Sequence, residues 1–146
     1  MTWQEIGYAI KIDGRIDGDL YLQILKDKLL ETLQFYGLDP PDIIFQQDND
    51  PKHTCRKVKE WLEEQDFRTM VWPAQSPDLS PIKYCWGYPK RRLAEYKHPP
   101  NRIHKLWERI QEEWKKIPAE ECQKLIESMP RRIEAVIKVK GGYTKY

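Results

Sequence analysis

The sequence lacks the features that mark membrane and secreted proteins. Among its 146 residues there is no run of eighteen apolar residues, so no membrane-spanning helix is expected. The first fourteen residues also lack the basic and then apolar segments of a secretory signal peptide. Internal repeats and low-complexity segments are absent as well. These absences together predict an intracellular globular protein without a membrane partner.

Cysteine and histidine are scarce. The three cysteines are widely spaced and include no Cys-x-x-Cys pair, and the three histidines are equally dispersed. An odd number of cysteines at such spacing favours reduced thiols and argues against a disulfide framework or a zinc site. Neither residue type therefore predicts a metal cluster.

What the sequence does contain is enough apolar and aromatic material for a folded domain. Hydrophobic residues make up 40% of the chain, which includes six tryptophans and eight tyrosines. A chain of this length can bury a substantial core, and the composition predicts a globular protein although 33% of the residues are charged. We expect a single domain over residues 1–146.

Charge is distributed unevenly along the chain. Residues 1–80 carry nine Lys/Arg and fifteen Asp/Glu, a net charge of −6, whereas residues 81–146 carry sixteen and eight, a net charge of +8. A basic half suits a phosphate-rich partner such as DNA. The alternative is a solvated helix surface, because many Lys and Glu residues lie four positions apart. The candidate DNA contacts are Lys90, Arg91, Arg92, Arg131 and Arg132.

The central part of the chain predicts two strand-to-helix junctions. Ile43-Ile44-Phe45 is typical of a short buried strand that ends just before Asp48, and Asp50-Pro51 should start a helix with Asp50 as its N-cap. A second strand is predicted over residues 67–72, followed by a proline-rich loop and a helix that starts at Ser80-Pro81. Proteins of the α/β class usually build their sites at such junctions.

The flanking segments predict a hairpin and several helices. Residues 2–12 alternate around Gly7 like two short strands, and residues 19–36 carry apolar side chains at helical spacing, with Asp19 as the cap and Gly37 as the stop. After Pro81 we expect a helix that breaks at Pro89, a helix over residues 102–117 capped by Asn101, and a last helix from Pro118 that Pro130 kinks or divides.

Four strings of residues resemble the catalytic domain of mariner-superfamily transposases, which belong to the DDE group. They are QDNDPKHT at 47–54, WPAQSPDLSPI at 72–82, KRRLAEY at 90–96 and ESMPRRIEAVIKVKGGYTKY at 127–146. They are long, unusual and in the right order, and the resemblance covers nearly the whole chain. It implies an α/β fold, namely an RNase H-like mixed sheet flanked by helices, with a helical C-terminal part.

The resemblance also implies DNA as the substrate and Mg²⁺ or Mn²⁺ as the cofactor. Enzymes of this family cut and join DNA with two divalent cations that three acidic residues hold. Asp48 matches the second of these residues. The third follows after 34 intervening residues in one common subgroup, which is the position of Lys83. An ammonium group cannot coordinate a metal, so Lys83 predicts a degenerate site in which cation binding is weak.

By the same resemblance, the first acidic residue lies on a central strand that would precede Met1, as would the helix-turn-helix modules of full-length relatives. A sheet without that strand should close differently or pair with a second copy of the chain as a homodimer. Asp50 and Asp78 are candidate replacement ligands, and Glu5 is a weaker one, although Asp50 as a cap and Asp78 as a loop residue also have structural roles. His53 lies beside the site in the motif, and we expect it on the surface of the helix.

Three functions are compatible with the sequence. The leading interpretation is a transposase-derived DDE endonuclease or integrase-type domain that lacks cleavage activity, because the first acidic residue is missing and Lys83 replaces the third. The second is a non-catalytic module that binds DNA or a transposase, and the third is a non-functional remnant. The resemblance to elements of eukaryotes implies a nuclear location.

Overall fold

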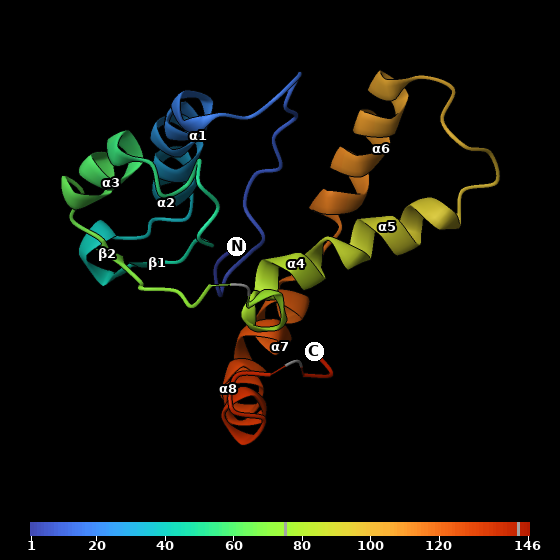
Figure 1. The fold of residues 1–146 in the computed structure, drawn as a ribbon. Helices are drawn as coiled ribbons and strands as arrows, with labels where there is room; N and C mark the ends of the chain where they lie inside the picture. The colour runs from blue at the N-terminus through green and yellow to red at the C-terminus, as the bar shows by residue number, and fades with distance from the viewer. Residues whose placement is uncertain (75, 143) are drawn as a thin grey trace. The chain divides into compact units, whose positions relative to one another are not determined.

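The computed structural model describes residues 1–74, 76–142 and 144–146, and Figure 1 shows the course of the chain. The chain divides into two compact units. The first, here called the strand unit, is Ile12–Gln75, and the second, the helical unit, consists of Met1–Lys11 and Ser76–Tyr146. In the described part of the chain, no helix is long and apolar enough to cross a membrane.

The strand unit begins with one long helical segment. Helix α1 (Gly18–Ile24) continues through a π-helical turn, η1 (Leu25–Leu29), into α2 (Leu30–Phe35). The N-cap is Asp17, whose carboxylate accepts a hydrogen bond from the backbone N–H of Leu20 at 2.9 Å. The prediction of Asp19 as the cap is therefore wrong, because the chain enters the helix two residues earlier. Gly37 follows the helix with φ +60°, in the left-handed conformation that a C-terminal glycine supplies.

Two short parallel strands form the sheet of this unit. A 3-10 turn, η2 (Pro40–Asp42), leads into β1 (Ile44–Phe45), and β2 is Arg68–Thr69. Ile44 pairs with Arg68 and Phe45 with Thr69, and the N–H of Arg68 donates to the carbonyl of Ile43 at 3.0 Å. The α/β class is thus confirmed. The prediction of a mixed sheet is wrong, because the described residues contain this two-stranded parallel sheet and no other.

The helix between the strands starts later than the sequence predicts. Helix α3 (Arg56–Glu63) has Cys55 as its N-cap, whereas Asp50 closes a turn in which the N–H groups of His53 and Thr54 donate to its carbonyl at 2.8 and 3.1 Å. The prediction of Asp50 as the helix cap is therefore wrong. The physical reason is that the side chain of His53 binds Asp48, which holds the intervening residues in turns.

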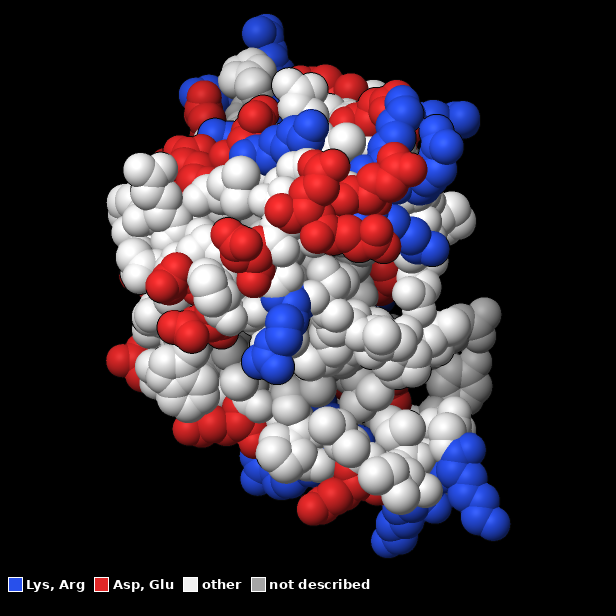
Figure 2. Space-filling model, turned by 90° about the vertical axis from the view of Figure 1, so that its left-hand side faces the viewer, with Lys and Arg blue, Asp and Glu red and all other residues white. Residues whose placement is uncertain are grey.

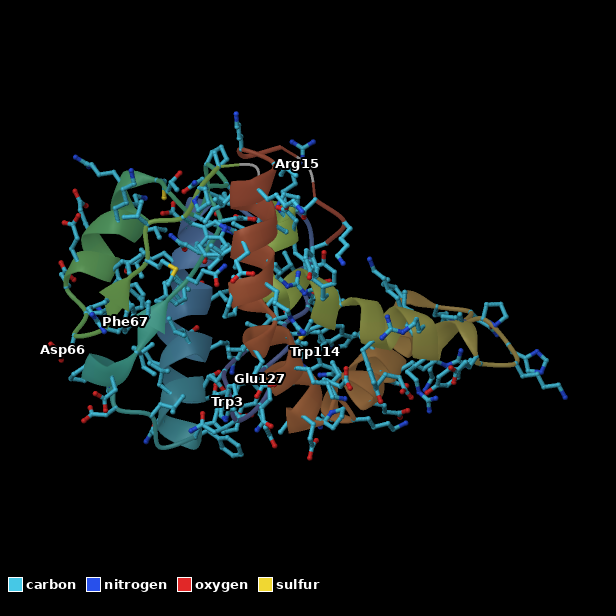
Figure 3. All side chains as sticks on the ribbon, turned by 90° about the horizontal axis from the view of Figure 1, so that it is seen from below. Trp3, Arg15, Asp66, Phe67, Trp114 and Glu127 are labelled. Atoms are coloured by element: carbon cyan, nitrogen blue, oxygen red, sulfur yellow. The ribbon has the colours of Figure 1, made fainter. Side chains whose placement is uncertain are left out.

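Apolar side chains from α1 to β2 form the core of the strand unit. Its aromatic centre is Trp61 on α3, which meets Phe67 edge to face at 6.3 Å between ring centroids. Figure 3 labels Phe67, which lies just before β2. The buried members of this core are Leu25, Leu33, Val58, Trp61, Leu62 and Phe67. The leucine pattern of residues 19–36 thus serves core packing, as its helical spacing predicts.

The helical unit consists of consecutive short helices. After the 3-10 turn η3 (Pro77–Leu79) come α4 (Pro81–Cys85), α5 (Gly87–Ala94), α6 (Ile103–Lys115), α7 (Ala119–Glu127) and α8 (Met129–Lys138). Its buried apolar core is formed by Ile6, Cys85, Trp114, Ile117 and Cys122. Burial raises the pKa of the Cys85 thiol to about 12, so this cysteine stays protonated and serves as an apolar side chain.

Prolines determine where two of these helices begin. The break predicted at Pro89 occurs earlier, at Trp86, so that Pro89 lies buried in the first turn of α5. A proline is tolerated there because the first N–H groups of a helix have no intrahelical partner. Pro130 lies in the same way in the first turn of α8, which confirms two consecutive helices at this point. The N-cap of α6 is Arg102, so the prediction of Asn101 is wrong by one residue.

The segment before the strand unit is not the predicted hairpin. The N–H of Thr2 donates to the carbonyl of Glu5 at 2.7 Å in a tight turn, and residues 2–12 contain no strand. Instead, Ile6 enters the core of the helical unit, and the indole N–H of Trp114, labelled in Figure 3, donates to the carbonyl of Gly7 at 2.9 Å. The alternating pattern fails because an isolated hairpin is only marginally stable, and this segment is fixed instead by its contacts with the helical unit.

Candidate functional site

Asp48 lies in the loop after β1, as the sequence predicts. One oxygen of its carboxylate, Oδ1, is 2.7 Å from Nδ1 of His53 and accepts a second hydrogen bond from the N–H of Asp50 at 3.3 Å. The side chain of Asp48 is 42% exposed and that of His53 is 19% exposed. The expectation that His53 lies on a helix surface is wrong, because it precedes the helix and binds Asp48.

Two further residues hold His53 in place. The ring of Tyr21, on α1, lies against the imidazole with 4.0 Å between the ring centroids. The hydroxyl of Tyr21 donates to Oε1 of Gln47 at 2.8 Å, and Nε2 of Gln47 donates to the carbonyl of His53 at 3.0 Å. Burial and the nearby carboxylate of Asp48 raise the pKa of Tyr21 well above its usual value. The hydroxyl therefore remains a donor under all ordinary conditions.

The neighbouring polar residues of the loop have structural partners. Asn49 donates to the carbonyl of Trp72 at 2.7 Å, which ties the loop to the segment after β2. The carboxylate of Asp50 binds the ammonium group and, at 3.1 Å, the backbone N–H of Lys52. These contacts with Lys52 hold the pKa of Asp50 below its usual range. Asp50 is thus fixed in a turn.

Lys83 belongs to the helical unit, where it lies exposed on α4. It lines a surface hollow of about 210 Å³ together with Pro77, Asp78, Tyr84 and Tyr146. Lys83, which stands at the predicted third acidic position, therefore shares this hollow with Asp78 and with the rings of Tyr84 and Tyr146.

Asp78 is held by the C-terminal part of the chain. Its carboxylate accepts a hydrogen bond from the hydroxyl of Thr144 at 2.8 Å, and its carbonyl accepts one from the guanidinium of Arg132 at the same distance. Arg132 also donates to Oγ of Ser128 at 2.7 Å and lies over the ring of Tyr84 at 4.1 Å. Asp78 therefore has the structural role of a loop residue.

The predicted DNA contacts differ in accessibility. Lys90, Arg91 and Arg131 are exposed, whereas Arg132 is only 3% exposed and is occupied by the contacts just described. Arg92 binds the carboxylates of Glu95 at 2.6 Å and of Glu113 at 3.3 Å. Of the five residues, the structure thus buries Arg132, whereas the other four are exposed, with Arg92 engaged by two carboxylates.

Glu113 is a buried carboxylate that binds Arg92 and two other residues. Its carboxylate, 2% exposed, accepts hydrogen bonds from Lys116 at 2.7 Å and from the hydroxyl of Tyr96 at 2.9 Å. The ammonium group of Lys116, followed by Tyr96 and Arg92, holds the pKa of Glu113 below its usual range. Glu113 thereby links α6 to the end of α5.

The described residues do not fit a pair of divalent cations. Such cations need several oxygen ligands that converge from different elements. No group of three His, Cys, Asp or Glu residues in the described part of the chain is close enough to hold a metal ion. Asp50 is bound by Lys52, Asp78 by Thr144, and Lys83 offers no lone pair. The other two carboxylates that the sequence names are Asp48, which binds His53 in the strand unit, and Glu5, which belongs to the helical unit.

Comparison with known proteins assigns the family. The sequence profile of the DDE superfamily endonuclease family matches residues 8–106. The chain belongs to the DDE superfamily. This DDE domain is similar to the Tcb2 transposase of Caenorhabditis briggsae, with 39% identity over 90% of this chain and 48% of the relative. It is also similar to the Tc1 transposase of Caenorhabditis elegans, with 43% identity over 70% of this chain and 37% of the relative.

Solved structures confirm the family fold. The catalytic domain of Mos1 transposase with raltegravir and Mg matches with a TM-score of 0.85 and 25% identity, over 99% of this chain and 74% of that chain. A Mos1 paired-end complex with Mn matches with a TM-score of 0.75 and 25% identity, over 90% of this chain and 39% of that chain. The DDE domain therefore spans less than half the length of the curated relatives that it resembles. The identification as a mariner-type DDE transposase domain is confirmed.

Sequence reasoning found Asp48 in this DDE domain and named His53 beside it, but it did not find the contact between them or the roles of Gln47 and Tyr21. Gln47 and His53 both lie in the string QDNDPKHT, so the motif carried that signal. Tyr21 lies 26 residues before Gln47, on α1, and nothing in its local sequence distinguishes it from a packing residue.

Proposed function

We propose that this chain is a DDE transposase-type domain that does not cleave or join DNA by itself. The observation that carries the proposal is the lysine at position 83, where the resemblance implies the third acidic residue. An ammonium group repels a cation and donates no electron pair to it. The lack of a three-residue metal-binding group among the described residues supports the same conclusion.

The test is a nicking assay on supercoiled plasmid with Mg²⁺ or Mn²⁺. A full-length mariner transposase serves as the active control, and Asp48→Asn serves as the control for contaminating nucleases. We expect no difference between the wild-type chain and Asp48→Asn. Cation-dependent nicking that Asp48→Asn abolishes would refute the proposal.

A second proposal is that the helical unit binds DNA without cleaving it. The helical unit carries seventeen Lys/Arg and ten Asp/Glu, a net charge of +7, whereas the strand unit carries eight and thirteen, a net charge of −5. Acidic side chains are prominent on the face shown in Figure 2. The proposed contacts are Lys90, Arg91 and Arg131, which are exposed. Mos1 transposase is a relative of this chain, and its structure in a paired-end complex supports DNA as the partner.

Salt dependence tests the DNA proposal. Each phosphate contact contributes about 0.9 to the slope of log K against log salt concentration. Replacing Lys90 and Arg91 together by Gln should therefore lower the slope by about 2. The matched control is Lys26→Gln with Lys59→Gln on the acidic strand unit, which should leave the slope unchanged. An equal effect of both pairs would contradict the assignment, and the lack of any binding would favour a remnant.

We further propose that residues 1–146 act as one domain whose sheet is completed by a strand from a second copy. The two-stranded sheet supports this, because so small a sheet is marginal and its edge can pair with another strand. Sedimentation velocity at micromolar concentration tests the homodimer, and a monomer that unfolds cooperatively would refute it. A nuclear location is part of the same proposal, and a fluorescent fusion in cells would test it.

A further inference from the structure

We propose that the connection between α5 and α6, residues 95–102 and here called the tip, binds the phosphates of duplex DNA through Lys97 and Arg102, and that Arg109 positions it. This rests on the proposal that the helical unit binds DNA, and it adds a contact surface beyond the three residues proposed there. The tip lies away from α7 and α8 in Figures 1 and 3.

Positive charge is concentrated in the segment around the tip. Residues 90–109 contain seven Lys/Arg and two Asp/Glu, a net charge of +5. Both acidic side chains are already paired, Glu95 with Arg92 at 2.6 Å and Glu108 with Lys105 at 2.8 Å. The remaining five basic side chains of the segment therefore have no carboxylate within it to neutralise them.

Lys97 and Arg102 present part of this charge to solvent. Both are exposed, and neither side chain has an ion pair or hydrogen bond with another residue that the structure describes. A phosphate can therefore bind them without breaking an existing ion pair. Pro99 and Pro100 lie between them, and because a proline ring fixes the backbone φ angle, the segment that separates the two basic residues is stiff.

Arg109 on α6 holds the residues on both sides of Lys97. Its guanidinium donates to the carbonyl of His98 at 2.7 Å and lies over the ring of Tyr96 at 4.5 Å. The hydroxyl of Tyr96 in turn donates to the buried carboxylate of Glu113 at 2.9 Å. Groups that are held in place before binding lose less entropy when a partner binds. Arg109 thus acts on DNA through the tip, as a positioning residue.

The side chains of this surface favour DNA over a protein partner. Protein interfaces have an apolar centre in which lysine is depleted, whereas protein–DNA interfaces are much more positively charged. Among residues 90–109, all of which the structure describes, Ile103 is the one large apolar side chain that is exposed. The acidic strand unit of a second copy is the alternative partner for such a basic surface.

Binding of a short fluorescent DNA duplex at several salt concentrations tests the contacts of the tip. Lys97→Gln with Arg102→Gln should lower the slope of log K against log salt concentration by about 2, since each phosphate contact contributes about 0.9. The matched control is Lys115→Gln with Lys138→Gln, which removes the same charge from exposed positions of the same unit. The control pair should change the slope by less than half as much.

Arg109 needs a readout that separates positioning from phosphate contact. Arg109→Gln removes the stacking on Tyr96, and it should weaken DNA binding about threefold while the salt slope stays the same. Arg109→Lys keeps the charge and should recover part of the affinity. A slope that falls by about 1 in Arg109→Gln would show that Arg109 itself contacts phosphate, and its positioning role would be wrong.

A variant that adds a charge guards against loss of folding as an explanation. Asn101 is exposed in the tip, so Asn101→Lys should raise the slope by about 1 and tighten binding. Unchanged or weaker binding by Asn101→Lys would overturn the inference, as would equal effects of the tip pair and the control pair. It is also overturned if the tip pair leaves DNA binding intact and abolishes a self-association seen by sedimentation velocity.

The failure of this inference can be told from the failure of the proposed function. If the wild type binds DNA and the Lys90 and Arg91 pair lowers the slope while the tip pair does not, the inference alone is wrong. If the tip pair lowers the slope and the Lys90 and Arg91 pair does not, the contacts proposed on α5 are wrong and the tip is supported. A wild type that binds no DNA would refute both.

Discussion

The two units of this chain differ in how far their charged side chains are buried. In the strand unit, the side chain of Asp48 is 42% exposed, and its carboxylate binds His53 and the N–H of Asp50 in the same loop. In the helical unit, Arg132 and Glu113 are 3% and 2% exposed and bind residues far away in the sequence. Removal of a buried charge leaves its partners unsatisfied in the interior, whereas groups around an exposed one can turn to water. The helical unit should therefore be the more sensitive of the two to changes of charge.

The largest effect is expected at Arg132. Arg132→Met removes the donor to the Asp78 carbonyl and to Ser128 Oγ, and also the cation over the Tyr84 ring. We expect a loss of about 3 kcal/mol in the free energy of unfolding. Urea unfolding followed by tryptophan fluorescence measures it. Arg131→Met, at the exposed neighbouring position, is the matched control and should change the free energy by less than about 0.5 kcal/mol. Similar losses for both variants would contradict the assignment of Arg132 to the interior.

A smaller loss is expected at Glu113. Glu113→Gln keeps the size of the side chain but removes the charge that Lys116 and Arg92 bind. A loss of about 2 kcal/mol is expected at pH 7, since hydrogen bonds to charged groups are the stronger ones. Glu112→Gln on the exposed face of the same helix is the control.

The effect of Glu113 should also depend on pH. Its pKa is lowered in the folded chain, so its contribution is complete above the usual pKa of a glutamate and is lost as the pH falls through the lowered value. The difference in unfolding free energy between the wild type and Glu113→Gln should therefore shrink between pH 7 and pH 3. A difference that is the same at both pH values would show that packing, and not the charge, accounts for the loss.

In the strand unit, the Tyr21 hydroxyl should contribute less. Tyr21→Phe keeps the ring against His53 and removes the hydrogen bond to Gln47, for an expected loss of about 1 kcal/mol. A double-mutant cycle with Gln47→Leu should show that the two changes are coupled, because they remove the same bond. Additive effects would mean that the hydroxyl contributes nothing through Gln47.

The raised pKa of Tyr21 also predicts how stability changes at alkaline pH. Burial raises its pKa in the folded state, so the unfolded chain loses this proton first as the pH rises. The contribution to stability is complete below the usual tyrosine pKa of about 10 and falls above it. The wild type should therefore lose more stability than Tyr21→Phe between pH 9 and pH 11. Unfolding curves at the two pH values measure this difference.

The comparison also shows what the sequence can predict. The strings around Asp48 and Lys83 identified the family, and apolar patterns located the two strands and most helices. The prediction of a buried first strand is wrong, since Ile44 is 50% exposed, and the second strand is Arg68–Thr69 and shorter than the predicted residues 67–72. Such patterns could not predict contacts between residues that are distant in the sequence. Arg132 looks like a DNA contact in the sequence because its buried environment is supplied by Asp78 and Tyr84, more than forty positions earlier. The hairpin over residues 2–12 was predicted from alternation alone, and alternation does not show whether a neighbouring strand is present.

The smallest effect on stability is expected at Lys83 in the helical unit. Lys83 is exposed on α4, so Lys83→Glu should change the free energy of unfolding by less than about 0.5 kcal/mol. It should also fail to restore cleavage, because Asp48 and the new glutamate make two carboxylates where the resemblance implies three. Plasmid nicking with Mg²⁺ or Mn²⁺ measures the outcome, with Lys83→Gln as the control that removes the positive charge without adding a ligand. If Lys83→Glu cleaves DNA and Lys83→Gln does not, another residue completes the site, and Asp50 and Asp78 would be the first to replace. A lack of cleavage by both variants would show that the defect of this chain extends beyond the charge at position 83.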